Sequence, residues 1–390
     1  MRVLLIHTFY TQKGGEDAVF KAEKELLETR HVVDELLFNN HNLNSLSPLK
    51  QVKNLFYNSS SYIKLEEKIK TFKPDVIHIH NLFYEASPSI LYAAQKYKVP
   101  TVITLHNYRL ICANALLLRE SKICELCVKK AIPLHGIKNK CFQDSALKTA
   151  LLIGSTSYHK LSGTWRNKVS RYIVFSEFQK SKILNSSLSL KESQVSIKPN
   201  FVEDCEQGDF ESRDNYYLFI GRLSKEKGVD LLLNAQKIGG FELEIIGGGE
   251  LEDTVKSEAN HNSKVTFHGF QQKEFILNKL KKAKALIFPS IWYEGMPITV
   301  LESLSTGTPI IMSDMDNISD MIEDGENGIL FKSGNAISLA ASINSFESIL
   351  KPTFYSNAFE TFQKKYSKER NLSLLEAIYI SLSESTEIID

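Results

Sequence analysis

The stretch ALIFPSIWYEGMPITVLESLSTGTPIIMSD, residues 285–314, shows most clearly which type of sheet the chain forms. Two short, almost entirely apolar runs stand at its ends, and Pro297 between them is suited to the first turn of a helix. Runs of this kind, which do not alternate polar and apolar residues, are typical of parallel strands buried on both faces. The stretch therefore predicts a strand, a helix and a second strand of one parallel sheet.

The same alternation of strand and helix recurs on both sides of this stretch. This alternation is interrupted at residues 198–215, which are rich in acids and also contain Pro and Gly. The pattern predicts an α/β protein of two doubly wound Rossmann-like domains that face each other across a cleft, with a hinge near residue 200. The predicted strands lie at 3–7, 31–38, 76–81, 101–107 and 172–176, then at 216–222, 241–247, 265–270, 285–290 and 309–314.

The composition agrees with the prediction of two domains. The chain has 390 residues, of which 43% are hydrophobic and 24% charged, enough for two domains with substantial cores. It contains no apolar run of about 18 residues, and MRVLLIHTFY is too short for a signal peptide. We therefore expect a cytoplasmic protein, in which five cysteines argue against a disulfide framework.

The net charge is only +1, but the charged residues are distributed unevenly between the two halves of the chain. Residues 1–200 carry 29 Lys and Arg against 16 Asp and Glu, whereas the remainder carries 18 against 30. A basic half of this kind indicates an anionic surface or ligand as a partner. Nucleic acid is not expected, because no recognition motif accompanies the charge.

Glu294 and Glu302 are the two glutamates of residues 285–314. Ligands of open parallel sheets bind beyond the carboxyl ends of the strands, where Glu294 is expected in a loop and Glu302 in the following helix. An ionised carboxylate accepts two hydroxyl donors at once, so the two acids suit a polyol with two diols. The alternative is that Glu302 only complements the helix dipole and that Glu294 is solvated.

Two cations follow another predicted strand. In FIGRLSKEKGVDLLLNA, residues 219–235, the strand leads to Gly221, Arg222 and Lys227 and then to a helix. Cations at a helix N-terminus form an anion site of about the charge that a diphosphate needs, although a solvated pair is the common alternative. IIGGGE, residues 245–250, adds a flexible turn around Gly248 but lacks the third glycine of a dehydrogenase fingerprint.

These motifs resemble, in their order and spacing, retaining glycosyltransferases of family four with the GT-B fold. The resemblance is carried by GRLSKEKG, IIGGGE, HGF, PSIWYEGMPITVLESLSTGTPII and ISDMIEDGENGILF. It implies that Arg222 and Lys227 neutralise the donor diphosphate and that Glu302 accepts the ribose hydroxyls. Glu294 is implied to hold the transferred sugar, with the backbone around Gly295, Met296 and Pro297.

Further site residues lie in the N-terminal half. Gly14 and Gly15 match the glycine loop of the family, and their alternative is an ordinary turn. His106 ends a predicted strand and matches the histidine that the family places near the transferred sugar. His78 and His80 alternate with apolar residues, which favours packing over metal binding.

An unusual insert spans residues 106–141. It contains Cys112, Cys124, Cys127 and Cys141. Four thiols, with one pair spaced CxxC, can hold a structural zinc ion; free buried thiols and a redox pair are the alternatives. A similar insert occurs in a subset of family-four enzymes that build polysaccharides.

The implied function is metal-independent hexosyl transfer from a nucleoside-diphosphate sugar. The implied acceptor is a glycan or polyprenyl-linked glycan of capsule or O-antigen biosynthesis. A nucleotide-sugar 2-epimerase and a non-catalytic binding module are the alternative functions. Residues 121–182 carry 12 basic side chains against three acids, which suits either a peripheral contact with an anionic membrane or a solvated helix.

The expected domains follow from the hinge and the resemblance. Residues 1–199 form the acceptor domain and residues 200–354 the nucleotide-sugar domain. The terminal helices, residues 355–390, are expected to pack back on the first domain.

Overall fold

The structure is a computed structural model that describes residues 1–11 and 15–387. The chain divides into two compact units. Unit 1 contains residues 1–117, 124–199 and the chain from 371 onward, and unit 2 contains residues 118–123 and 200–370. Each unit is built around a six-stranded parallel sheet, which confirms the predicted fold class of two Rossmann-like domains.

The sheet of unit 1 has the strand order β2-β1-β3-β4-β7-β8. Its central strands are buried on both faces, as their continuous apolar sequences require. The strands are β1 (Arg2–Phe9), β2 (Val32–Asn39), β3 (Val76–Ile79), β4 (Thr101–Thr104), β7 (Arg171–Val174) and β8 (Val195–Ile197).

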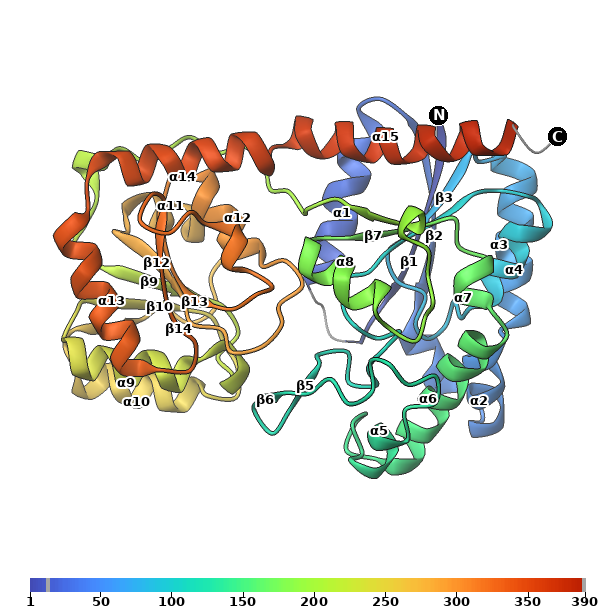
Figure 1. The fold of residues 1–390 in the computed structure, drawn as a ribbon, viewed down its shortest axis with the longest axis horizontal. Helices are drawn as coiled ribbons and strands as arrows, with labels where there is room; N and C mark the ends of the chain where they lie inside the picture. The colour runs from blue at the N-terminus through green and yellow to red at the C-terminus, as the bar shows by residue number, and fades with distance from the viewer. Residues whose placement is uncertain (12–14, 388–390) are drawn as a thin grey trace. The chain divides into compact units, whose positions relative to one another are not determined.

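Most helices of unit 1 flank this sheet, as the blue to green part of Figure 1 shows. Several start at side chains that cap the first turn, among them Asn58, Ser145 and Ser176. They are α1 (Gly15–Glu28), α2 (Pro48–Phe56), α3 (Ser59–Phe72), α4 (Ser89–Lys96), α5 (Leu134–Lys138), α6 (Ala146–Leu161), α7 (Thr164–Asn167) and α8 (Glu177–Leu184), with the short helices η1 (Asn40–Ser45) and η2 (Glu192–Gln194).

The sheet of unit 2 has the strand order β11-β10-β9-β12-β13-β14. This is the 3-2-1-4-5-6 order of dinucleotide-binding folds. The strands are β9 (Tyr217–Ile220), β10 (Leu243–Ile246), β11 (Val265–Phe267), β12 (Ala285–Phe288), β13 (Ile310–Asp314) and β14 (Gly328–Lys332). Residues 285–314 thus form β12, a helix and β13, with β12 and β13 paired in parallel.

Helices cover both faces of the sheet of unit 2 (Figure 1). On one face lie α9 (Val229–Gly239), α10 (Glu252–His261) and α13 (Ala336–Ile349). On the other lie α11 (Lys273–Lys282), α12 (Ile298–Ser305) and α14 (Pro352–Lys365). The short helices of this unit are η3 (Phe210–Ser212), η4 (Lys225–Lys227) and η5 (Ser319–Met321).

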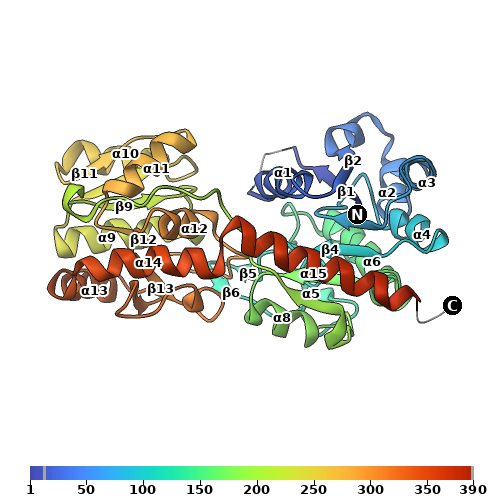
Figure 2. The same ribbon diagram turned by 90° about the horizontal axis from the view of Figure 1, so that it is seen from above.

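The chain leaves unit 2 later than the sequence suggested. We expected the terminal helices to pack on the first domain from residue 355, but the division falls after Arg370. Helix α14 packs on α12, and Tyr355 donates a hydrogen bond to the carbonyl of Lys284 in the same unit. Only the last helix, α15 (Lys368–Glu387), continues into unit 1, as the red helix of Figure 2 shows.

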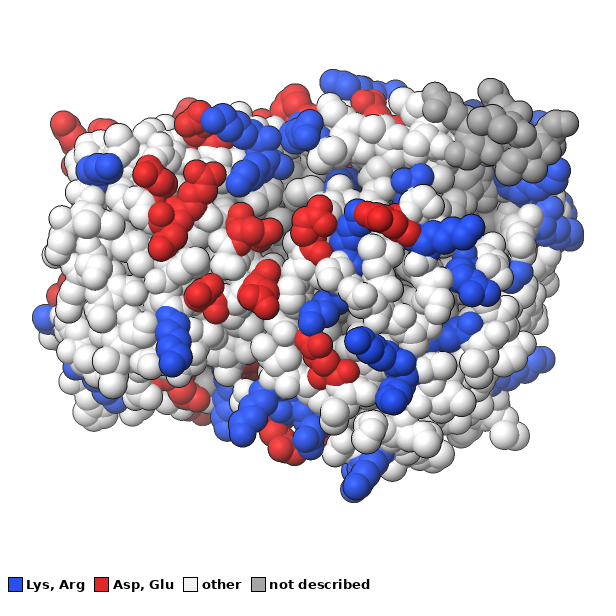
Figure 3. Space-filling model, viewed as in Figure 1, with Lys and Arg blue, Asp and Glu red and all other residues white. Residues whose placement is uncertain are grey.

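The predicted insert forms a short hairpin, β5 (Leu118–Arg119) and β6 (Lys122–Ile123), followed by α5. Helix α5 packs on α6, and Ala113 and Ile137 of the insert join the hydrophobic cluster around Leu152 and Ile153 of α6. Among the described residues, none of the helices combines the length and the apolar character that a bilayer crossing requires. On the face drawn in Figure 3, Lys and Arg spread over unit 1, while Asp and Glu gather over unit 2.

Candidate functional site

In unit 2 the strand order reverses between β9 and β12. The chain first adds strands on one side of β9 and, from β12 on, adds them on the other. Ligands of such sheets bind beyond the carboxyl ends of the strands at this reversal. The loops that follow the two strands, residues 221–228 and 289–297, are therefore the first candidates for a site.

Glu294 lies in the loop after β12, with only 5% of its surface exposed. Its Oε1 atom accepts hydrogen bonds from Lys227 Nζ at 2.7 Å, Ser290 Oγ at 2.7 Å and Trp292 Nε1 at 2.9 Å. No donor among the described residues reaches its Oε2 atom. Because each carboxylate oxygen accepts about two hydrogen bonds, Oε2 is available to hydroxyl groups of a ligand.

Lys227 reaches this carboxylate from the loop after β9. Its side chain is 19% exposed, and Nζ lies 5.6 Å from the ring centre of Trp292 and 5.8 Å from that of Phe288. We predicted Lys227 as a phosphate ligand, and in the structure its ammonium is ion-paired with Glu294. An ammonium has three N–H donors, so it retains donors for a neighbouring anion.

Arg222 lies in the same loop but points to a different partner. Its guanidinium lies 3.1 Å from Glu226 Oε1, and its side chain is 60% exposed. Such an exposed pair stabilises the fold by at most about 1 kcal/mol, so an anion displaces it at little cost. The backbone carbonyl of Glu226 also accepts from the N–H of Ile291 at 3.0 Å, which ties the loops after β9 and β12 together.

Two glycines let the turn after β10 approach the turn after β9. A Cβ atom on Gly247 would lie 1.9 Å from the carbonyl oxygen of Gly221, and one on Gly249 would lie 2.6 Å from that of Leu223. Both glycines have a positive φ, 144° and 154°. Gly248, the glycine predicted to lie at the site, is less constrained, since its Cβ would meet only the carboxylate of Glu252 at 3.3 Å.

Glu302 lies one turn into α12 and is 9% exposed. Burial raises the pKa of its carboxyl to about 7, and the positive charge of Lys273 opposes this rise. No hydrogen bond to this carboxyl comes from the described residues. A buried acid without a protein partner is costly and is a frequent mark of a ligand site.

The residues after Glu294 lead into α12. Pro297 is the residue just before the helix, one position earlier than predicted. The backbone N–H groups of Gly295 and Met296 have no acceptor among the described residues. Asn317 holds the loop by donating to the carbonyl of Glu294 at 2.9 Å. Free N–H groups next to a helix start are suited to an anion or a hydroxyl oxygen.

Unit 1 contains a small cavity of about 30 Å³ near the carboxyl ends of β3 and β4. This volume is enough for a water molecule. The polar residues that line it are Glu16, His80, Asn81, Thr104, His106, Asn107 and Arg109.

His106 is partly buried and lies at this cavity, two residues after β4. Its Nε2 atom lies 3.0 Å from Nδ1 of His80, and the two rings stack with centres 5.2 Å apart. Burial holds the pKa of His106 well below its usual value, so the imidazole is neutral at ordinary pH.

The predicted glycine loop is only partly visible. Gly14 lies outside the described residues, and Gly15 is the first residue of α1, with open space where a Cβ would stand. The next residue, Glu16, accepts a hydrogen bond from Asn81 Nδ2 at 3.1 Å. Burial, with the negative charge of Asp17, raises the pKa of Glu16 to about 7. Neither Glu16 nor Asn81 was singled out from the sequence.

The four cysteines of the insert share one neighbourhood. Burial and then the other three thiols raise the pKa of Cys127 to about 11. A tetrahedral zinc site with Zn–S bonds of about 2.3 Å needs sulfur atoms about 3.8 Å apart. Among the described residues, no three of the thiols lie within 4.8 Å of one another. The thiols as placed do not form a closed zinc site, and zinc stays a prediction that metal analysis tests.

Two family models match the chain. "Glycosyltransferase Family 4" matches residues 28–204, and "Glycosyl transferases group 1" matches residues 202–352. An uncharacterized glycosyltransferase of Methanocaldococcus jannaschii is 24% identical and covers 98% of this chain and 99% of its own. The lipopolysaccharide 1,6-galactosyltransferase of Escherichia coli is 25% identical over 48% of this chain and 55% of its own.

Solved structures share the fold over nearly the whole chain. HepE of Anabaena, solved in complex with UDP, has a TM-score of 0.65 and 16% sequence identity, covering 97% of this chain and 99% of its own. The same protein has also been solved in complex with UDP-glucose. These structural matches show the fold, and the two family models with the galactosyltransferase relative support a glycosyltransferase of the family-four type with the GT-B fold.

Proposed function

We propose that the protein moves a sugar from a nucleoside-diphosphate sugar to a hydroxyl group of a glycan or lipid-linked glycan, with retention of the anomeric configuration. The observation that carries this proposal is the meeting of Lys227 and Glu294 at the strand reversal of unit 2. HepE, in complex with UDP and with UDP-glucose, supports the class of donor. The lipopolysaccharide galactosyltransferase supports a role in cell-surface polysaccharide.

The donor would be held by its two sugar rings and its diphosphate. Glu302 accepts the ribose hydroxyls, and Oε2 of Glu294 accepts hydroxyls of the transferred sugar. The N–H groups of Gly295 and Met296 add donors beside it. The role of His106 next to the transferred sugar is part of the same proposal.

Arg222 and Lys227 carry the chemistry by neutralising the leaving group. The bond between the anomeric carbon and the diphosphate oxygen breaks, and the acceptor oxygen bonds to the same face of that carbon. The acceptor proton passes to a phosphate oxygen, and the nucleoside diphosphate leaves with the bonding electron pair. Stabilising a leaving anion by fixed charges is worth several kcal/mol in comparable sites. The two cations supply this charge without a metal ion in the proposed mechanism.

The acceptor is proposed to lie at a membrane. The insert surface comprises exposed apolar residues and exposed lysines around α5 and the start of α6. Apolar side chains among lysines suit the interface of an anionic leaflet. A peripheral position on the cytoplasmic face of the cell membrane would give access to a polyprenyl-linked acceptor. These residues are Leu126, Lys129, Lys130, Ile132, Leu134, Lys138, Lys140, Leu147 and Lys148.

A donor panel tests the proposed function. Purified protein is incubated with UDP-, GDP- and dTDP-sugars, and the melting temperature and the released nucleoside diphosphate are measured. A ligand of the folded state raises the melting temperature. We expect one donor class to stabilise the protein and to be hydrolysed slowly, with a released sugar of unchanged anomeric configuration. Release of a 2-epimer, or no stabilisation by any donor, would contradict the proposal.

A further inference from the structure

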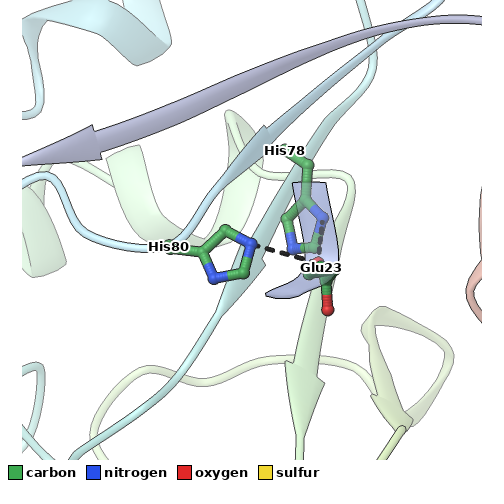
Figure 4. A group of neighbouring side chains, drawn as sticks. All are labelled: Glu23, His78 and His80. Atoms are coloured by element: carbon green, nitrogen blue, oxygen red, sulfur yellow. Dashed lines mark hydrogen bonds and ion pairs between the residues drawn. The ribbon is translucent and has the colours of Figure 1, made fainter. Parts of the chain in front are cut away.

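A buried group of polar side chains lies beside the cavity of unit 1, outside the roles proposed above. Glu23 lies in α1, His78 lies in β3, and His80 directly follows β3 (Figure 4). Glu23 Oε1 lies 3.0 Å from His80 Nε2 and 3.1 Å from His78 Nδ1. All three residues are at most 3% exposed.

These ligand atoms lie within 4.8 Å of one another, a spacing that a metal ion could occupy. Lys198 argues against a metal, because its Nζ atom lies 2.7 Å from the other oxygen of Glu23. A divalent cation on this carboxylate would face the ammonium across a few ångströms of low-dielectric interior. The contact of His80 with Glu23 is a direct hydrogen bond, whereas Nδ1 of His78 is hydrogen-bonded to the hydroxyl of Tyr379 at 2.7 Å.

Lys198 also fixes the charge of the group. The ion pair with Lys198 keeps the pKa of Glu23 well below its usual value despite complete burial, so the carboxylate is ionised. Glu23 and Lys198 together are neutral. A proton added to His80 would leave one uncompensated positive charge in a buried site, which is unfavourable. The group without net charge is the one in which the imidazole of His80 is neutral.

The positions of the protons follow from this charge. A carboxylate only accepts hydrogen bonds, so the proton of neutral His80 is on Nε2, which faces Glu23. Nδ1 of His80 is then an acceptor, and the hydrogen bond of 3.0 Å to His106 requires a proton on Nε2 of His106. Because His106 is neutral as well, its Nδ1 carries no proton. That atom has no partner among the described residues.

We propose that Glu23, neutralised by Lys198, acts through His80 to hold His106 as the Nε2–H tautomer, so that His106 offers its Nδ1 atom to a ligand as a hydrogen-bond acceptor. Glu23, His80 and Lys198 are positioning residues in this proposal. His106 would then accept a hydrogen bond from a sugar hydroxyl and would not donate one to a phosphate oxygen. The tautomer rests on the contacts of unit 1 alone, whereas the sugar hydroxyl as partner rests on the proposed function.

Nitrogen NMR of the unliganded wild-type protein tests the tautomer directly. The protein is labelled with ¹⁵N-histidine, and two-bond couplings from the ring protons distinguish a protonated nitrogen from an unprotonated one. The chain has ten histidines, so the His106 signals are assigned by their loss in His106→Asn. We expect the Nε2–H tautomer of His106 to exceed the Nδ1–H tautomer about tenfold or more, because one hydrogen bond to a charged group stabilises by this amount. A dominant Nδ1–H form, or an even mixture, would overturn the proposal.

The variant Glu23→Gln tests whether Glu23 sets the tautomer. Its carbonyl oxygen would turn to Lys198, which can only donate, and its amide N–H would face His80. His80 must then accept at Nε2 and donate at Nδ1, so His106 should change to the Nδ1–H form. The matched control is Glu85→Gln, a buried carboxylate of unit 1 that contacts Asn39 and Asn42 instead of the histidines.

These spectra do not depend on enzymatic activity. A folded Glu23→Gln protein in which His106 keeps the Nε2–H form would refute the role of Glu23. If this variant does not fold, the wild-type spectrum still decides whether the tautomer is correct. A failed donor assay with the expected tautomer would count against the proposed function and leave the hydrogen-bond assignment intact.

Discussion

Lys227 Nζ and Glu294 Oε1 lie 2.7 Å apart although 67 residues separate them in the chain. One follows β9 and the other follows β12, strands that pair directly in the sheet. Ser290 and Trp292 donate to the same carboxylate oxygen and leave the second oxygen open. The pair thus combines a cation with an oriented hydroxyl acceptor, the two groups that a sugar diphosphate needs.

Replacing Lys227 by Met should reduce turnover strongly. The change removes a cation that would stabilise the leaving diphosphate and also leaves the buried carboxylate of Glu294 without its charge partner. By analogy with the loss of one oxyanion-hole donor, we expect kcat to fall about 10²- to 10³-fold, or about 2.7–4 kcal/mol. Steady-state kinetics with the identified donor measure this effect. The control is Lys225→Met, an exposed lysine of the same loop, and equal losses in both variants would contradict the assignment.

Ionisation of the Glu302 carboxyl should lower the free energy of unfolding as the pH rises. Its pKa is raised to about 7 in the folded state, so between about pH 4.5 and 7 the native protein binds more protons than the unfolded chain. The favourable contribution of the neutral acid is complete below about pH 4.5 and is lost as the pH approaches 7. A shift of this size corresponds to about 3 kcal/mol. Urea unfolding of Glu302→Gln at several pH values should show a flatter dependence than wild type, and parallel curves would exclude the effect.

The same group should make donor binding stronger at higher pH. Only the ionised carboxylate accepts two hydroxyl donors, so the ribose needs Glu302 without its proton. A nucleoside-diphosphate sugar has both phosphates esterified, and its own charge is constant between pH 6 and 8. Donor binding would release one proton from Glu302, so we expect the donor affinity to rise about tenfold over this interval. Calorimetry measures this affinity. Glu302→Gln should bind weakly and without this dependence, and an unchanged slope would refute the role.

The strands were predictable where apolar runs are continuous. All ten predicted strands are present, whereas β8 and β14 of the two parallel sheets and the short hairpin strands β5 and β6 were missed. β8 has only three residues, and β14 begins with Gly328, a residue that sequence patterns associate with turns. Short edge strands depend on pairing with a neighbour that is already in place, such as β7 or β13, and local sequence carries little of that information.

The site residues were predictable as loop positions but not as partners. Parallel strands bring their carboxyl ends to one edge, so Lys227 and Glu294 could be assigned to that edge from sequence. Their ion pair depends on β9 lying next to β12, which alternation of strands and helices does not determine. Glu23 was missed because a glutamate in a polar helix usually indicates a solvated face. Its partner Lys198 stands 175 residues away.

Gly247→Ala should unfold or strongly destabilise unit 2. A Cβ at this position would lie 1.9 Å from the carbonyl oxygen of Gly221, and φ is 144°, which a residue with a side chain rarely adopts. The control is Gly334→Ala, which has φ of 73° and open space around the new Cβ. We expect backbone strain to lower the free energy of unfolding of the control by about 1–2 kcal/mol. The free energy of unfolding of Gly247→Ala should fall by clearly more. Chemical unfolding measures both, and equal losses would show that the turns are not in close contact.

Neutralising two lysines of the insert surface should weaken binding to anionic membranes. Lys129 and Lys130 are exposed beside Leu126 and Ile132, whose side chains are 51% and 53% exposed. Each lysine near an anionic leaflet contributes about 1 kcal/mol, so Lys129→Gln with Lys130→Gln should lower the affinity about 30-fold. Sedimentation with vesicles of phosphatidylglycerol and phosphatidylcholine measures the bound fraction at low and physiological salt.

The matched control for this surface is Lys332→Gln with Lys351→Gln, two exposed lysines of unit 2. It removes the same charge from the whole protein but leaves the insert unchanged. If net charge alone drove binding, both double variants would lose equal affinity. We expect the control to bind as wild type does, because only a lysine within about one Debye length of the leaflet, some 8 Å at physiological salt, feels its field. Equal loss in the two variants, or wild-type binding that is the same to neutral and anionic vesicles, would refute the insert surface as the membrane contact.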